Sequence, residues 1–275
     1  MTTVIKLGGE LALPASSARL EAIVASVAEL VASGERVVVT HGGGPQVSAL
    51  MRERGLTPRM VAGQRVTDGA ALTALIMAVG GEVNVALTST LIGKGVDAIG
   101  LTGVSAGLIR CRRRPPKVVA SENDALVDYG LVGDVVSVRH EMLEQLTALG
   151  LVPVIACIGA DERGRPLNVN GDTVAQEVAV ALRADRLLLL TSTPGVLADK
   201  DDLSTRIPIL EREQARAEIA AGVIAGGMIA KVEEAFDAVS KGVKEVHILG
   251  DLGAGDLERA VRDPGSLGTV LRDPS

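Results

Sequence analysis

Thr3-Val4-Ile5-Lys6-Leu7-Gly8-Gly9-Glu10 is the stretch that decides the fold of this 275-residue chain. Its β-branched residues predict a strand, and its two glycines predict a loop where that strand ends. Glycine lets the backbone approach a ligand closely, and Lys6 places a cation beside the loop. We interpret the stretch as a phosphate-binding edge of a sheet. A lysine on a first strand is more often a solvated edge charge, so this interpretation depends on the other residues brought to the same edge.

A second strand with a similar ending follows. Arg36-Val37-Val38-Val39-Thr40 predicts a buried strand, and His41-Gly42-Gly43-Gly44-Pro45 predicts a glycine-rich turn that leads into a helix. Strand and helix patterns then alternate along most of the chain, which is typical of an α/β fold with a mainly parallel sheet and helices on both faces. The stretch from Gly107 to Val132 differs from this pattern, and we expect a β-hairpin there.

Composition limits the possible functions. Hydrophobic residues make up 47% of the chain and charged residues 23%, as in a soluble globular protein. One Phe, one Tyr and no Trp leave few stacking surfaces, so an adenine site must be built from aliphatic side chains and backbone. The same scarcity, with a net charge of −6, argues against nucleic acid as a partner.

The cysteines and histidines do not form a recognisable metal motif. Cys111 and Cys157 lack a paired spacing, and only three histidines are present, so no metal site built by the protein is expected. The chain shows no basic leader and no uncharged apolar segment long enough to span a bilayer. We therefore expect a cytoplasmic protein without a membrane partner. The usual P-loop and dinucleotide-binding glycine motifs are also absent.

The remaining polar motifs suit phosphoryl transfer. They comprise Lys6, Lys231, Arg65 in a Gly-x-Arg-x-Thr-Asp setting, and Asp172 at a predicted helix start. The transition state of this reaction spreads negative charge, which cations and positioned N–H groups stabilise. A carboxylate acceptor is already ionised at neutral pH, so no general base is needed. Taken singly, Arg65 has a simpler explanation as a structural ion pair, Lys231 as a solvated helix residue and Asp172 as a partner of the helix dipole.

Taken in order, six motifs resemble the amino-acid kinase family over nearly the whole chain. They are Lys6-Leu-Gly-Gly9, His41-Gly-Gly-Gly44-Pro45, Gly63-Gln-Arg65-Val-Thr-Asp68, Gly100-Leu-Thr-Gly103, Asn168-Val-Asn170-Gly-Asp172 and Gly226-Gly-Met-Ile-Ala-Lys231. The resemblance implies a three-layer αβα sandwich formed by one domain. Within it, an N-terminal lobe (about 1–165) would bind the acyl-amino acid and dimerise, and a C-terminal lobe (about 166–275) would bind the nucleotide.

The resemblance also implies an activity. It is the transfer of phosphate from ATP to the side-chain carboxylate of N-acetyl-L-glutamate, which gives N-acetyl-L-glutamyl 5-phosphate in the second step of arginine biosynthesis. Mg²⁺ would arrive with the ATP. In this comparison Lys6 and Lys231 act on the transferring group, and Asp172 orients them.

Binding residues are implied in the same way. The nucleotide and its phosphates would be held by Gly8, Gly9, Gly43, Thr191 and Gly195. The acyl-amino acid would be held by Gly42, Gly43, Gly44, Arg65, Asn168 and Asn170.

Three departures from the family pattern leave alternatives open. Ser192 stands where an aspartate is usual near the nucleotide, Gly171 replaces a commoner alanine and Ala230 a commoner proline. One alternative keeps the chemistry and changes the acceptor to carrier-bound α-aminoadipate, for lysine biosynthesis, or to another N-acyl glutamate. A second alternative, suggested by Ser192, is a non-catalytic sensor of nucleotide or amino acid.

The family comparison also bears on assembly. Arginine-inhibited hexamers of the family carry an extra helix before the first strand, whereas the first strand here begins at Thr3. We therefore expect a homodimer with weak or absent inhibition by arginine.

Overall fold

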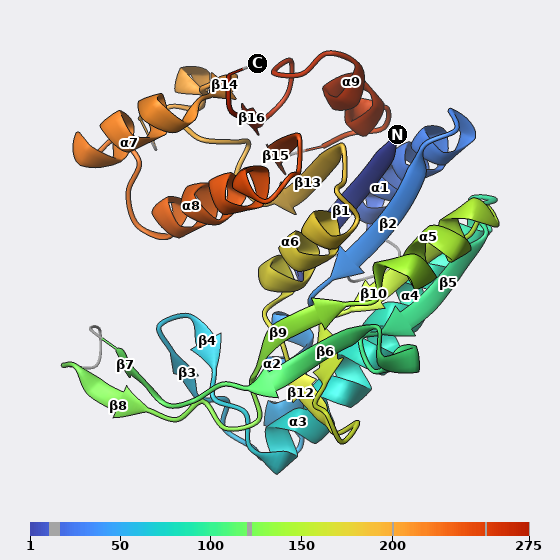
Figure 1. Ribbon diagram of the computed structural model, residues 1–275, viewed down its shortest axis with the longest axis vertical. Coiled ribbons are helices and arrows are strands. Elements are labelled where there is room, and N and C mark those ends of the chain that lie inside the picture. The colour runs from blue at the N-terminus through green and yellow to red at the C-terminus, as the bar shows by residue number, and fades with distance from the viewer. Residues whose placement is uncertain (11–16, 120–122, 200, 251, 275) are drawn as a thin grey trace.

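An eight-stranded sheet forms the centre of the protein (Figure 1). The computed structural model describes residues 1–10, 17–119, 123–199, 201–250 and 252–274. In spatial order the strands are β14 (Ile209–Leu210), β16 (Thr269–Leu271), β15 (Glu245–Gly250), β13 (Arg186–Thr191), β1 (Thr2–Leu7), β2 (Arg36–His41), β10 (Val152–Ala156) and β5 (Ala98–Thr102). The strands from β15 to β5 are parallel, and β16 runs antiparallel to β15.

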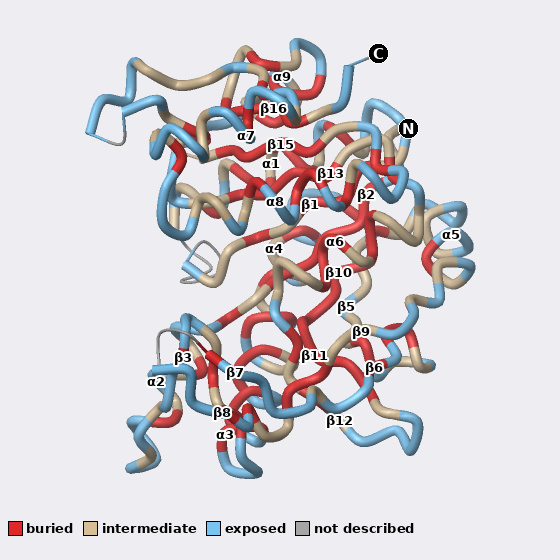
Figure 2. Tube along the Cα trace, turned by 60° about the vertical axis from the view of Figure 1, so that its left-hand side comes forward, coloured by how far each residue is buried: buried red, intermediate tan, exposed pale blue. Residues whose placement is uncertain are grey.

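Helices cover both faces of this sheet. One face packs against α5 (His140–Ala148), α6 (Gly171–Ala181) and α8 (Gly227–Ser240), and the other against α1 (Ala18–Ala32), α4 (Asn84–Gly93) and α9 (Asp256–Arg262). Along β1, Val4 belongs to the first apolar cluster and Ile5 to the second, as the alternation of a strand requires. Figure 2 shows the buried strands between more exposed helices. The predicted three-layer αβα sandwich is confirmed.

A second, smaller sheet stands beside the carboxyl ends of the main strands. Its order is β12 (Pro166–Asn168), β11 (Ile158–Ala160), β6 (Ile109–Arg113) and β9 (Gly133–Val138). Two hairpins adjoin it: β3 (Met60–Val61) with β4 (Gln64–Arg65), and β7 (Lys117–Val119) with β8 (Ala125–Val127). The expected hairpin between Gly107 and Val132 is therefore confirmed, with residues 120–122 outside the described part. The four-stranded sheet itself was not predicted.

Tyr129 lies at the centre of a small apolar cluster beneath the hairpins. Its ring is buried with Val61, Val119, Val127 and Val132. The Lys117 ammonium nitrogen lies 5.7 Å from the ring centroid, within the range of a cation–π contact. This cluster fixes the β7–β8 hairpin to the β3–β4 hairpin.

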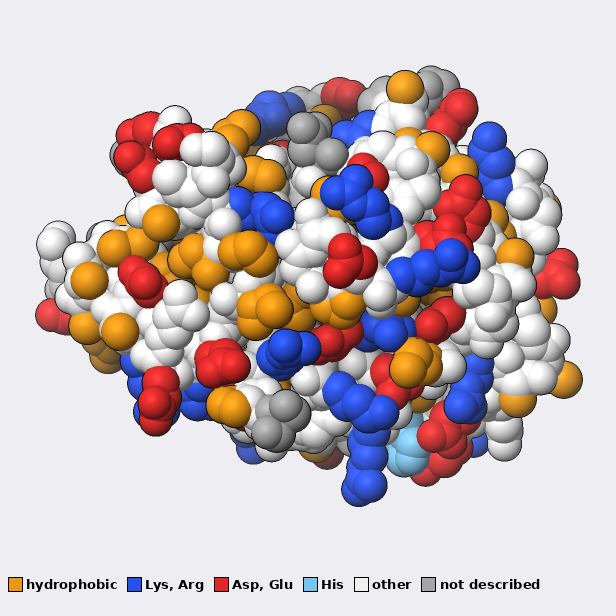
Figure 3. Space-filling model, turned by 90° about the horizontal axis from the view of Figure 1, so that it is seen from above, with side chains coloured by type: hydrophobic (Ala, Val, Ile, Leu, Met, Phe, Trp, Pro, Cys, Tyr) orange, Lys and Arg blue, Asp and Glu red, His pale blue; other side chains and the backbone are white. Residues whose placement is uncertain are grey.

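The remaining helices complete the fold. They are α2 (Gly44–Glu53), α3 (Gly69–Leu75), the π-helical stretch η1 (Ile76–Val83), α7 (Arg212–Ala220) and two short 3₁₀ turns (Ser105–Gly107 and Leu203–Thr205). The segments α3, η1 and α4 form one helix from Gly69 to Gly93 that is long and apolar enough to cross a membrane, with a mean hydropathy of 1.7. Half of that apolar window is buried inside the fold, so this is weak evidence for a membrane span. On the face shown in Figure 3, basic and acidic side chains are interspersed.

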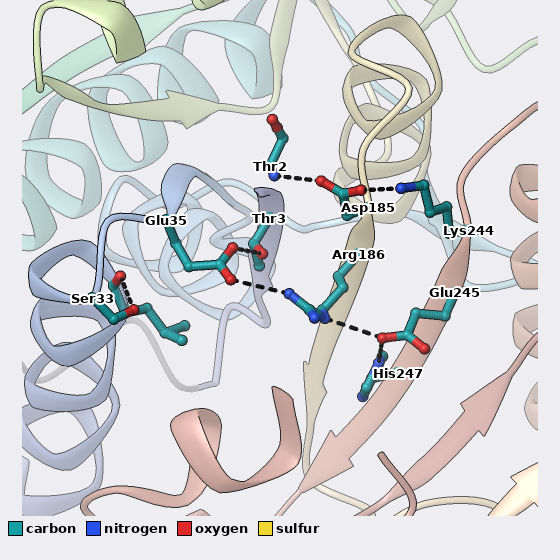
Figure 4. Close-up of polar contacts among 10 residues, drawn as sticks. Thr2, Thr3, Ser33, Glu35, Asp185, Arg186, Lys244, Glu245 and His247 are labelled. Atoms are coloured by element: carbon teal, nitrogen blue, oxygen red, sulfur yellow. Dashed lines mark hydrogen bonds and ion pairs between the residues drawn. The ribbon is translucent and has the colours of Figure 1, made fainter. Parts of the chain in front are cut away.

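A cluster of charged side chains closes the amino-terminal edge of the sheet (Figure 4). The Arg186 guanidinium lies 3.1 Å from a carboxylate oxygen of Glu35 and 3.1 Å from one of Glu245. Glu35 also accepts a hydrogen bond from the Thr3 hydroxyl, and Glu245 lies 3.0 Å from Nε2 of His247. The side chains of the three ion-pair partners are only 11–15% exposed. Arg186 therefore joins β13 to β15 and to the segment before β2.

Arg186→Met tests this cluster. The substitution leaves the largely buried carboxylates of Glu35 and Glu245 without their cation, and breaking a buried pair in this way costs about 3–5 kcal/mol. We expect the free energy of unfolding in urea to fall by that amount. Arg36→Met is the control, because Arg36 is exposed and makes no ion pair among the described residues. A loss below about 1 kcal/mol for Arg186→Met would show that the cluster does not hold the strands together.

Asn84 and His41 connect the helix layer to the carboxyl ends of the strands. The Asn84 amide nitrogen donates to Nε2 of His41 (2.9 Å) and to the Val154 carbonyl (2.9 Å). Because Nε2 of His41 accepts, Nδ1 carries the proton and donates to the Gly42 carbonyl (2.9 Å). Burial lowers the pKa of His41 from 6.5 to about 4, and the bond to Gly42 offsets only part of this shift. The imidazole is therefore neutral at physiological pH and fixes the start of the second glycine loop.

His41→Gln tests this neutral imidazole through stability. Between pH 6.5 and about 4 the unfolded chain binds a proton at His41 that the folded chain does not bind. Stability from this group is therefore complete above pH 6.5 and decreases by roughly 3 kcal/mol as the pH falls to 4. We expect the parent protein to show this additional decrease in urea unfolding and the variant to lack it. An NMR titration of His41 with its midpoint near 6.5 would contradict the assignment.

Candidate functional site

Two glycine loops meet where β1 and β2 end. A side chain at Gly9 would place its Cβ 3.0 Å from Cδ of Pro45 and 3.1 Å from Cα of Gly43. A Cβ at Gly43 would lie 2.8 Å from Cγ2 of Val79. The loops therefore pack closely, with Gly9 against the backbone of Gly43 and Gly43 against the side chain of Val79, and glycine fits these two positions without displacing a neighbour. Gln46 adds a link, since its amide nitrogen donates to the Gly9 carbonyl (2.9 Å).

One carboxylate holds two lysines at this edge. Nζ of Lys6 lies 2.7 Å from Oδ1 of Asp172, and Nζ of Lys231 lies 3.7 Å from Oδ2. Burial by itself raises the pKa of Asp172, but the ammonium groups of Lys6 and then Lys231 outweigh it and lower the pKa below its ordinary value. Asp172 is therefore ionised at neutral pH and balances part of the positive charge of the two lysines. This contact joins β1, α6 and α8.

Helix starts place two members of this group. Asn170 caps α6 by accepting hydrogen bonds from the backbone N–H groups of Asp172 (2.7 Å) and Thr173 (3.3 Å). The cap holds Asp172 in the first turn, as the sequence predicts. Gly226 has a φ of 59° and precedes α8, so Lys231 projects from the second turn of that helix.

A cavity of about 170 Å³ lies next to the carboxylate–lysine group. Its wall includes Gly42, Gly43 and Gly44 from the second glycine loop, together with Arg65, Asn168 and Asn170. Asn168 donates through its amide nitrogen to the Thr67 hydroxyl (2.9 Å), which fixes the orientation of its side chain. All six residues predicted to bind the acyl-amino acid therefore line one cavity.

Arg65 is a buried cation beside this cavity. It is 7% exposed, and its guanidinium donates to the Gly44 carbonyl (3.0 Å) and the Ser48 hydroxyl (2.8 Å). Burial, followed by the charge of Arg52, lowers the pKa of Arg65. No carboxylate lies within 4.0 Å of its guanidinium in the described part of the chain, so the simpler explanation as a structural ion pair has no partner there. A buried unpaired guanidinium favours an anionic ligand.

A second cavity, of about 600 Å³, lies on the other side of the site, between the loop that follows β13 and the start of α8. It is lined by Thr193, Gly195, Val196, Leu197, Ala198, Asp199, Ala221, Gly222, Val223, Ile224, Ala225 and Met228. Gly195 is required here because it has a φ of 145° and a Cβ would lie 2.8 Å from Oγ1 of Thr269. Thr191 ends β13, and its hydroxyl is hydrogen-bonded to the Thr193 backbone.

The structure thus places most of the predicted residues in three neighbouring groups. Lys6, Asp172 and Lys231 are in contact, the six acyl-site residues line the first cavity, and Gly195 lines the second. Gly8 lies beside β13, where a Cβ would be 3.4 Å from the Leu190 carbonyl oxygen. Thr191 is not among the residues that line either cavity in the described part.

Sequence reasoning missed three residues of this region. Gln46 was not considered, although it follows the glycine loop directly. Gln64 and Arg114 also line the first cavity. Arg114 ends a run of three arginines, Arg112 to Arg114, which by itself indicates a solvated hairpin face, yet its side chain is only 15% exposed. Its neighbours Arg112 and Arg113 are exposed.

The described residues of the site offer no ready metal cage. Within the described ranges, no three His, Cys, Asp or Glu side chains are grouped to hold a metal ion. The Asp172 carboxylate is already engaged by the two lysines. This donor set is compatible with a divalent cation that is carried by a phosphate ligand.

Comparison with known proteins places the chain in a family. A sequence profile described as "Amino acid kinase family" matches residues 1–250. A protein of Anaeromyxobacter sp. (strain K) named acetylglutamate kinase is 48% identical over 270 residues, which cover 98% of each chain. A protein of Sorangium cellulosum with the same name is 44% identical over 268 residues, which cover 98% of this chain and 93% of the relative.

Among solved structures, N-acetylglutamate synthase from Neisseria gonorrhoeae shares the fold, with a TM-score of 0.82 and 24% identity over 100% of this chain and 60% of the synthase. The profile and the two relatives together settle the classification: this chain belongs to the amino acid kinase family.

Proposed function

We propose that this chain transfers the terminal phosphoryl group of ATP to the side-chain carboxylate of N-acetyl-L-glutamate, the second step of arginine biosynthesis. The contact of Lys6 and Lys231 with Asp172, between an anion-binding cavity and a larger second cavity, carries the proposal. The relatives named acetylglutamate kinase, at 44–48% identity over nearly the full chain, support it.

The proposed mechanism is electrostatic. Lys6 and Lys231 supply positive charge from two elements to a group that becomes more negative as it is transferred. Asp172 keeps both ammonium groups at this edge when no ligand compensates their repulsion. N–H groups of the glycine loops are available to bind phosphate and acceptor oxygens. The acceptor carboxylate needs no base, because it is ionised at neutral pH.

The first cavity suits an acidic N-acylated amino acid. Arg65 would pair with the α-carboxylate, and Asn168 and Asn170, which line the same cavity, would add polar groups around it. Binding in this orientation would direct the side-chain carboxylate of the ligand towards Lys6. Most residues that line the cavity lie between Gly42 and Cys157, in the proposed N-terminal lobe, and Asn168 to Gly171 come from the start of the proposed C-terminal lobe.

The second cavity is the proposed nucleotide site, in the C-terminal lobe. Its lining contains no aromatic side chain among the described residues, and this agrees with an adenine site made of aliphatic groups and backbone. Gly8, Gly9, Gly43 and Thr191 would face the phosphates from the carboxyl ends of the strands. Mg²⁺ would be bound through the phosphates of ATP and would neutralise part of their charge. Ser192 supplies a hydroxyl in place of a carboxylate in this region.

Lys6→Ala and Lys231→Ala test the proposal. Each removes one ammonium group from the transition state, and we expect kcat to fall on the order of 10²–10³-fold. ADP release with N-acetyl-L-glutamate is the measurement. Lys94→Ala is the control, since Lys94 is exposed at the end of α4. Both lysine variants retaining the parent kcat would refute the assigned roles.

The parent protein distinguishes the alternatives in the same assay. Free glutamate, N-succinylglutamate and carrier-bound α-aminoadipate are compared with N-acetyl-L-glutamate as acceptors. Turnover of another acceptor without turnover of N-acetyl-L-glutamate would change the substrate and keep the chemistry. Binding of both ligands without any turnover would support the sensor.

A homodimer and a cytoplasmic location remain predictions. The exposed side of the long helix carries Met77, Val85 and Ile92, which are 45–64% exposed. The nearby strand β5 is the last in the sheet order, so its outer edge lacks a paired strand in the described structure. An unpaired edge beside an apolar helix face favours association with a second copy.

Light scattering tests the dimer. We expect a mass of twice the 28.2 kDa chain for the parent and a shift towards monomer for the double variant Val85→Lys/Ile92→Lys. Leu149→Lys is the control and should stay dimeric. Leu149 is 77% exposed and lies at another side of the molecule. A hexamer in dilute solution would refute the predicted assembly.

A further inference from the structure

We propose that the side-chain amide of Gln64, held in place by Arg114, donates a hydrogen bond to the acyl oxygen of the acceptor substrate. This inference rests on the proposed function, because it concerns how the first cavity recognises the N-acyl group. Gln64 is then a binding residue, and Arg114 is a positioning residue that acts through Gln64.

Arg114 connects four parts of the chain around the cavity. It follows β6, and its Nε donates to Oδ1 of Asp134 on β9 (2.7 Å). Its Nη1 donates to Oε1 of Gln64 on β4. Its guanidinium carbon lies 6.0 Å from the ring centroid of Tyr129. These contacts hold a side chain that is 15% exposed, so the guanidinium has a defined position in the wall of the cavity.

The chemistry of arginine fixes the orientation of the glutamine. A guanidinium can only donate, so the side-chain oxygen of Gln64 must face Arg114. The amide nitrogen of Gln64 is then the end available to another partner. In the described ranges of the chain no protein group accepts a hydrogen bond from it. Gln64 and Arg114 both line the first cavity, so this N–H₂ group is available to a ligand there.

A ligand that binds this N–H₂ group must offer it a hydrogen-bond acceptor to which no other protein group donates. In the proposed orientation Arg65 pairs with the α-carboxylate, and the side-chain carboxylate lies near Lys6. The acyl carbonyl oxygen is the remaining acceptor of N-acetyl-L-glutamate. A free amino group is a cation and a donor, so it would meet the donating end of Gln64 and two guanidinium groups unfavourably. The same arrangement thus favours an acylated amino acid over a free one.

Two substitutions of Gln64 separate donation to the ligand from packing. Gln64→Met keeps the length of the side chain and removes donor and acceptor. Gln64→Glu keeps the acceptor for Arg114 and removes the donor. Loss of one such hydrogen bond corresponds to about a tenfold change in affinity. We expect the Kd and KM for N-acetyl-L-glutamate to rise about tenfold in Gln64→Met and at least as much in Gln64→Glu. The KM for ATP should stay unchanged in both.

The matched ligand is glutarate, which has two carboxylates and no acyl group. Its affinity, measured by calorimetry, should not change in Gln64→Met. Arg114→Met should raise the KM for N-acetyl-L-glutamate by a smaller factor and maintain kcat. The double variant Gln64→Met/Arg114→Met should lose no more affinity for N-acetyl-L-glutamate than Gln64→Met alone. Arg112→Met, an exposed neighbour in the same run, is the control and should behave like the parent.

The outcomes are distinct. If Gln64→Met binds N-acetyl-L-glutamate as well as the parent does, or loses affinity for glutarate equally, the inference is wrong. If the parent shows no turnover of N-acetyl-L-glutamate, the proposed function fails, and calorimetry then decides the inference separately. A parent protein that binds N-acetyl-L-glutamate no better than glutarate would overturn the inference about Gln64. A parent that binds it better, with that advantage lost in Gln64→Met, would support it.

Discussion

The pairing of one carboxylate with two ammonium groups is the interaction on which the rest of this structure depends. Lys6 and Lys231 come from β1 and α8, and they repel each other unless Asp172 lies between them. The capped start of α6 keeps Asp172 in place, and the glycine turn before α8 sets the direction of Lys231. A charge arrangement that would be unfavourable by itself is thereby built into the meeting point of three elements. It is the kind of fixed electrostatic environment that phosphoryl transfer requires.

The two ends of the same parallel sheet are used in opposite ways. At the carboxyl end, glycine loops leave backbone groups accessible, and the cations there have fewer carboxylates than they can bind. At the amino end, Arg186 is enclosed by Glu35 and Glu245, so its charge is compensated within the protein. The contrast follows from parallel topology, which brings equivalent ends of neighbouring strands to one edge. The buried cation Arg65 lies where a ligand can compensate its charge, and the buried cation Arg186 lies where strands must be held together.

Features set by local sequence could be predicted, and features set by distant pairing could not. The first strand, the glycine loops and the Asn170 cap depend on a few neighbouring residues, and they place Lys6 and Asp172 correctly. The four-stranded sheet depends on the pairing of the three-residue strand β11 with β6, where Ala160 faces Arg110 across a long stretch of chain, so no periodicity reveals it. The π-helical turns of η1 likewise lie inside an apolar run that reads as an ordinary helix. Arg114 and Gln64 are fifty positions apart, and an arginine run alone does not show which member turns inward. Cations near glycines could therefore be assigned from sequence, but side chains that orient one another could not.

The aliphatic character of the chain has a spectroscopic consequence. With no tryptophan and a single tyrosine, the near-ultraviolet emission of the protein comes almost entirely from Tyr129. That ring lies beneath the hairpins, in contact range of the Lys117 and Arg114 cations and next to the wall of the first cavity. A signal that in most enzymes averages over many chromophores here reports on one position. The protein thus contains its own optical probe of how the hairpins pack over the site, without any label.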